Sequence, residues 1–93
     1  MKKFRIIPRV AIYENGEKEN LLFLPDIPAQ KGFIVCYARV GEHSEASFDF
    51  YRDTVLPNPE TLTLFDWYVK NKCGPDDKPI MRQRLALKTL AKS

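Results

Sequence analysis

The strongest constraint on the fold is a nearly continuous apolar run in the middle of the chain. Residues 33–40, FIVCYARV, combine β-branched, aromatic and small apolar side chains. Lys31-Gly32 precedes this run and predicts a turn. A short apolar run of this kind is typical of a strand covered on both faces of a sheet. We therefore expect residues 33–40 to form a central strand.

Two further strands are predicted before this run. Residues 3–13 alternate apolar and basic side chains, as a strand with one buried face does. Asn15-Gly16 then predicts a tight hairpin that leads to a return strand at 19–24. Pro8 interrupts the first strand and has no N–H to donate, so this strand is expected at a sheet edge or bulged at Pro8.

After the central strand, the pattern predicts a fourth strand and a helix. A polar stretch that begins at Gly41 indicates a turn, and Phe48 and Phe50 alternate with polar neighbours in a segment expected to be a strand at 47–52. Asn58 and Pro59 are typical of a helix start, which predicts a helix over 59–73.

The carboxyl-terminal segment 80–91 fits two descriptions. Its composition favours a helix, whereas its basic and apolar side chains alternate as in a half-buried strand. In either case the fold class is α+β. We expect a single small domain over residues 1–93, with an antiparallel sheet of three to four strands covered by the helix at 59–73.

The charge pattern separates the ends of the chain from its middle. The net charge is +3, and residues 1–13 and 80–93 each carry four basic side chains and no acidic one. Residues 14–79 carry seven basic and twelve acidic side chains. If the two ends lie side by side, they would form an anion-binding or nucleic-acid-binding face. Its candidate residues are Lys3, Arg5, Arg9, Arg82, Arg84 and Lys88.

One short motif resembles the signature of RNA-recognition domains. Lys31, Gly32 and Phe33 match its basic, glycine and aromatic positions. Ile34 then stands where that family has a small residue, and a shift of one position would turn the following side chains to the opposite face of a strand. The predicted hairpin also leaves no room for the helix that this family places between its first two strands. We therefore do not assign the chain to that family.

No motif in the chain indicates catalysis, a metal or a cofactor. His43 is the only histidine, and its spacing from Cys36 and Cys73 matches no zinc pattern. Cys36 and His43 would make a nucleophilic pair only if they lay together. Four carboxylates lie between residues 42 and 53: Glu42, Glu45, Asp49 and Asp53. They would form a site only if the fold brought them together.

The remaining expectation is a non-catalytic, cytoplasmic accessory module that binds a protein partner or itself. Tryptophan and tyrosine are enriched among the residues that dominate protein interfaces. The candidate partner-binding residues are Trp67, Tyr68 and Phe65, and a homodimer through their helix is one alternative. A nucleic-acid-associated accessory protein is the other. We expect no membrane partner, because no apolar run approaches the ~20 residues that span a bilayer.

Overall fold

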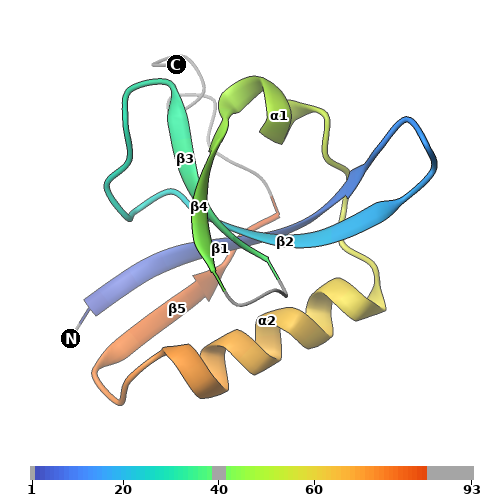
Figure 1. Cartoon of the computed structure of the whole chain (residues 1–93). Helices are drawn as coiled ribbons and strands as arrows, with labels where there is room; N and C mark the ends of the chain where they lie inside the picture. Colours follow the sequence, from blue (N-terminus) through green and yellow to red (C-terminus); the bar gives the residue numbers. More distant parts are fainter. Residues whose placement is uncertain (1, 39–41, 84–93) are drawn as a thin grey trace.

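The computed structural model of the chain describes residues 2–38 and 42–83, which form a five-stranded mixed sheet with two helices (Figure 1). The strand order is β4-β3-β2-β1-β5. The elements are β1 (Lys2–Ile12), β2 (Lys18–Leu24), β3 (Phe33–Ala38), β4 (His43–Ser47), α1 (Phe48–Arg52), α2 (Pro59–Lys72) and β5 (Asp77–Met81). The α+β class is confirmed, although the sheet has more strands than the three to four expected.

The predicted hairpin between β1 and β2 is confirmed. The two strands pair antiparallel, with Ile7 opposite Phe23 and Ile12 opposite Lys18. The turn between them places Gly16 at φ 86°, a left-handed conformation that glycine adopts without steric cost. No helix separates these two strands, in contrast to the RNA-recognition domains.

The run at 33–40 forms a strand that is buried on both faces, as predicted. Ile34 and Cys36 contribute to the buried cluster on one face, and Val35 and Tyr37 to the cluster on the other. β3 lies between β2 and β4, and the middle position of the sheet belongs to β2. The strand ends at Ala38 among the described residues; residues 39 and 40 lie outside them.

The prediction of a strand at 47–52 is wrong. Residues 48–52 form the short helix α1, and the strand β4 occupies the polar stretch before it, where a turn was expected. The side chain of Ser47 accepts a hydrogen bond from the backbone N–H of Phe50 and so caps the helix. β4 is an edge strand whose side chains are exposed or half-buried, so its sequence lacks the large apolar residues that mark a buried strand.

The carboxyl-terminal segment contributes a strand earlier than predicted. β5 spans residues 77–81 and pairs parallel with β1, so the expectation of a purely antiparallel sheet is also wrong. The reason is visible in Figure 1: α2 carries the chain back beneath the sheet before β5 begins, and parallel strands need such a return. Of the segment at 80–91, residues 84–91 lie outside the described residues.

Pro8 is accommodated without making β1 an edge strand. β1 lies between β2 and β5, so the expected edge position is wrong for the strand as a whole. β5 pairs with β1 only as far as Ile6, and the next contact on that side is the bridge between Val10 and Val55. Pro8 falls between these two contacts, where its missing N–H removes no pairing bond.

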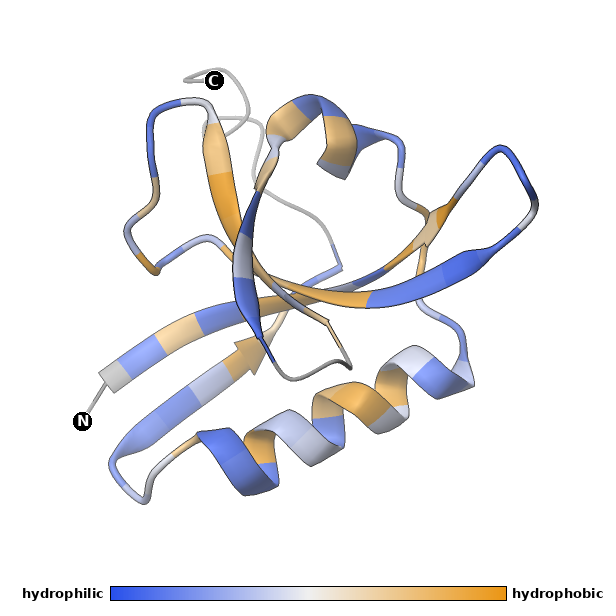
Figure 2. Cartoon of the chain, viewed as in Figure 1, coloured by the Kyte–Doolittle hydropathy of each residue, from blue (hydrophilic) through white to orange (hydrophobic). Residues whose placement is uncertain are grey.

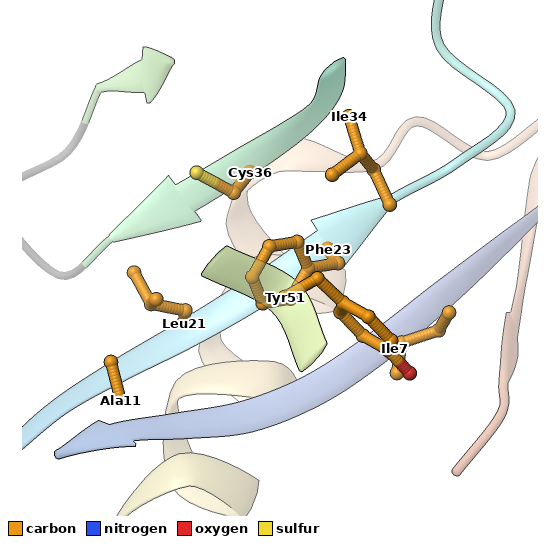
Figure 3. Close-up of a cluster of buried hydrophobic side chains, with 7 residues drawn as sticks. All are labelled: Ile7, Ala11, Leu21, Phe23, Ile34, Cys36 and Tyr51. Carbon is orange, nitrogen blue, oxygen red and sulfur yellow. The ribbon is translucent and has the colours of Figure 1, made fainter. Parts of the chain in front are cut away.

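Each face of the sheet carries one helix and one buried cluster. On the first face, Tyr51 of α1 packs edge-on against Phe23 with ring centroids 5.0 Å apart (Figure 3). On the opposite face, Leu64 and Tyr68 of α2 pack against Leu22, Leu24, Val35 and Tyr37. We call these the α1 face and the α2 face. The helix predicted at 59–73 is confirmed as α2, whose capping box joins Asn58 and Thr61.

Candidate functional site

The most distinctive surface of the described chain is the outer edge of β4. β4 pairs with β3 on one side, and no other described strand pairs with it on the other side. Figure 2 shows the hydrophilic ribbon of β4 beside the hydrophobic ribbon of β3. An unpaired edge leaves backbone N–H and C=O groups able to bind another chain.

Hydrogen-bond alternation shows which backbone groups face outward, starting from β1. Val10 exchanges both backbone bonds with Val55, on the side away from β2. Successive residues of a strand direct their backbone N–H and C=O groups to opposite edges. Arg9 therefore bonds to β2, where it lies opposite Leu21. The next residue of β2, Leu22, therefore bonds to β3.

The same alternation continues to the free edge. Leu22 lies opposite Tyr37, so Tyr37 bonds to β2 and Cys36 bonds to β4, opposite Ser44. The backbone groups of His43 and Glu45 consequently point away from the sheet. Within residues 2–38 and 42–83, these outward groups make no hydrogen bond.

A hollow of about 500 Å³ lies on the α1 face beside this edge. Its apolar lining comes from three strands and one helix. Acidic residues line it too, and none of the described lysines or arginines does. The residues that form the apolar part are Leu21, Phe33, Cys36, Ala38, Ala46 and Phe50, and the acidic ones are Glu19, Glu42 and Glu45.

A smaller depression lies on the α2 face of β4. It is lined by Ile27, Val35 and His43, with Ser44 and Glu45 at the edge. One carboxylate oxygen of Glu45 accepts a hydrogen bond from the backbone N–H of Gln30 at 3.2 Å. The free edge is therefore flanked by a concave surface on each face of the sheet.

An aromatic cluster supports the beginning of β4. Nε2 of His43 lies 2.9 Å from the hydroxyl of Tyr68, and the rings of Tyr37 and Tyr68 meet edge-on at 4.8 Å. Burial is the main cause that raises the pKa of Tyr68 to about 12. Its hydroxyl is therefore neutral at physiological pH and holds His43 of β4 to α2.

Among the described residues, neither the Cys36–His43 pair nor a metal-binding cluster is brought together. Cys36 lies on the α1 face and His43 on the α2 face, so the two do not form a pair. Burial raises the pKa of the Cys36 thiol, which suppresses the reactive thiolate. Both cysteines are free. The described residues contain no cluster of His, Cys, Asp or Glu side chains able to hold a metal ion.

The four carboxylates between residues 42 and 53 do not converge. All four are exposed. Asp49 forms an ion pair with Arg52 at 2.7 Å on α1, and Glu45 bonds to Gln30. Glu42 and Glu45 give the β4 edge an acidic character.

The structure divides the three predicted partner-binding residues between surface and core. Trp67 is 47% exposed, stacked near Tyr37 with ring centroids 6.3 Å apart. Tyr68 is buried against the sheet, and Phe65 is half-buried against the same cluster. Only Trp67 is thus accessible as an anchor.

The predicted basic face is brought together in part. β1 and β5 lie side by side, with Lys3 opposite Lys78, a residue not among the candidates. Arg5 forms a salt bridge to Asp26 at 2.7 Å. Arg9 donates to Thr54 and lies over the ring of Tyr51. The side chain of Arg82 is exposed, whereas Arg84 and Lys88 lie outside the described residues.

The sequence pattern missed the free edge because β4 reads as a polar turn. A signal was present: small Ser44 and Ala46 alternate with polar His43 and Glu45 at period two. Without the pairing partner, that alternation is too short to tell a strand from a loop.

No described helix has the length and apolar character needed to cross a bilayer. In comparisons with known proteins, no protein-family model, no curated protein and no solved structure matches this chain.

Proposed function

We propose that this chain is a non-catalytic protein-interaction module that binds an extended segment of a partner at the outer edge of β4. The observation that carries this proposal is the outward direction of the backbone groups of His43 and Glu45, beside a hollow on each face. Strand addition uses such backbone groups for affinity and flanking pockets for specificity.

The opposite edge of the sheet supports the choice of β4. The backbone N–H of Arg82 bonds to the carbonyl of Ile6, so alternation directs Pro79 of β5 outward. A proline on the outer side of an edge strand cannot donate to an added strand, and it is one of the devices that keep edges unpaired. Proline is absent from β4.

The test is a display selection of random peptides on the immobilised full chain, with Glu45→Pro as the matched variant. This substitution removes an outward N–H and leaves the bonds from β4 to β3 intact. We expect selected peptides to bind the wild-type chain and to lose binding to Glu45→Pro. Peptides that bind both chains equally, or no selection at all, would overturn the proposal. Urea unfolding verifies that the variant is folded, and Glu45→Gln separates the charge from the backbone effect.

A homodimer is one form that this activity could take, with β4 of a second copy as the added strand. Sedimentation of the purified chain over a range of concentrations tests it. If the chain associates and Glu45→Pro abolishes the association, pairing through β4 is supported. Association that Trp67→Ala abolishes would instead support the helix interface.

Nucleic-acid binding is the second candidate, favoured by the adjacency of Lys3 and Lys78. It has less support, because the guanidinium groups of Arg5 and Arg9 are already engaged by Asp26 and Thr54. Phosphate contacts give an affinity that falls steeply with salt. This candidate would be favoured if the chain bound labelled duplex DNA at ~50 mM salt and the double variant Lys3→Glu/Lys78→Glu did not.

A further inference from the structure

We infer that the partner segment is a strand in which apolar and basic side chains alternate, with the apolar side chains on the α1 face and the basic ones beside Glu45 on the α2 face. This inference rests on the proposed strand addition at β4, and it names the chemistry of the ligand. Successive side chains of any added strand point to opposite faces. Each face of the β4 edge therefore selects every second residue of the partner.

The α1 face selects apolar side chains. A side chain on this face of the added strand would lie beside Ser44 and Ala46, at the mouth of the hollow of about 500 Å³. The strands beneath it supply Leu21 and Cys36, and α1 supplies Phe50. The thiol of Cys36 is neutral because burial raises its pKa. An aliphatic or aromatic side chain would gain from burial in this hollow.

The α2 face selects a positive charge. Glu45 lies opposite Val35 and is exposed, and its Oε1 atom is the one that accepts from Gln30. A basic side chain on the neighbouring strand would lie directly across from Glu45, and opposite charges in that position stabilise a sheet. The other ionisable side chain on this face of β4 is His43, held by Tyr68.

The surroundings of the edge carry the same sign. Glu42 lines the hollow where β4 begins, and its side chain makes no hydrogen bond or ion pair with another residue in the part of the chain that the structure describes. Between residues 42 and 47 the sequence contains two acidic side chains, Glu42 and Glu45, and neither lysine nor arginine, whereas Asp49 on α1 is paired with Arg52. Complementary charge of this kind determines which partners associate, and speeds their encounter. It excludes acidic strands that the apolar hollow alone would accept.

Fluorescence anisotropy with short labelled peptides tests this inference on the full chain. The probe alternates lysine and valine, and its controls alternate glutamate with valine and serine with valine. We expect the lysine peptide to bind at least tenfold more tightly than either control. Glu45→Lys should weaken its binding roughly tenfold, whereas Asp66→Lys, an exposed charge reversal on α2, should leave it unchanged.

N-methylation of the peptide separates this inference from the proposed function. Methyl groups on alternate amides block one edge of the peptide, so methylation in one register should abolish binding, and in the other register should not. Suppose that the serine or glutamate peptide binds as tightly as the lysine peptide, and that methylation in only one register abolishes its binding. The preference for basic side chains is then overturned, and strand addition stands. If the lysine peptide binds equally in both methylated registers, or no peptide binds at ~1 mM, the inference is overturned. The display selection with Glu45→Pro then decides the proposed function separately.

Discussion

Two tyrosines on the α2 face of the sheet differ in what their hydroxyl groups touch. The hydroxyl of Tyr68 lies 2.9 Å from Nε2 of His43. The hydroxyl of Tyr37 is buried and has no hydrogen-bond partner among the described residues. Removal of one oxygen atom from each residue should therefore change the free energy of unfolding in opposite directions.

The expected magnitudes follow from burial. Tyr37 is 1% exposed, and a buried hydroxyl without a partner costs about 1–3 kcal/mol. Tyr37→Phe relieves that cost and leaves a void of only one atom, so it should stabilise the chain by about 1 kcal/mol. Tyr68→Phe loses one satisfied bond and should destabilise the chain by about 1 kcal/mol. The two variants should thus differ by about 2 kcal/mol.

Urea unfolding followed by tryptophan fluorescence measures both changes, because Trp67 is the only tryptophan and its ring stacks near that of Tyr37. For a domain of this size, a difference of about 2 kcal/mol corresponds to roughly 10 °C between thermal midpoints. In a His43→Ala background, Tyr68→Phe should lose most of its effect, which a double-mutant cycle would show. The reasoning would be refuted if Tyr37→Phe destabilised the chain as much as Tyr68→Phe does while the slope of the unfolding free energy against urea concentration stayed the same.

Three further predictions concern stability. Asn58→Ala removes the side chain that accepts from the Thr61 N–H at 2.9 Å, and should cost about 1 kcal/mol by urea unfolding, whereas Thr63→Ala on the exposed face of α2 should cost less. Because burial raises the pKa of Tyr68 to about 12, the folded state favours the neutral phenol. The full contribution of this group to the free energy of unfolding should be present below pH 10, and roughly 2 kcal/mol should be lost as the pH rises toward 12. The loss should be smaller in Tyr68→Phe. Arg5 lowers the pKa of Asp26, so Asp26→Asn should destabilise the chain by up to about 1 kcal/mol at pH 7. The difference in stability between this variant and the wild-type chain should disappear as acid protonates the carboxylate. A difference that stays unchanged at low pH would contradict this cause.

The elements that the sequence predicted correctly are those with local signals. Asn15-Gly16 defines its hairpin within a few residues, because the turn needs positive φ and the flanking strands supply the alternation. Asn58 and Pro59 define the start of α2 in the same local way. The apolar run of β3 has the length of a strand and is rich in β-branched and aromatic residues, which favours a strand buried on both faces.

The elements that the sequence did not predict depend on distant partners. β5 is a strand because β1 offers it an unpaired edge, and nothing within residues 77–81 indicates the parallel direction. Phe48 and Phe50 alternate as in a strand, yet Ser47 caps a helix there and Phe50 packs against the cluster on the α1 face. The candidate site depends on the same information, since an outward backbone group is defined only by the strand order. The aromatic residues of α2 are typical of interfaces by residue type alone, yet the sheet buries Tyr68.

The two edges of the sheet differ in a way that connects the charge pattern with solubility. The β4 edge is acidic at Glu45, and the β1–β5 side is basic, with Lys3 opposite Lys78. Two complementary edges on one chain would let copies add head to tail, and a contact of that type builds open filaments unless its rotation closes a ring. Pro79 prevents this, because it withholds a hydrogen-bond donor from the middle of the β5 edge while leaving the bonds to β1 in place. Under the proposed strand addition at β4, this arrangement keeps the β5 edge from pairing with β4 of another copy and leaves β4 for its partner strand.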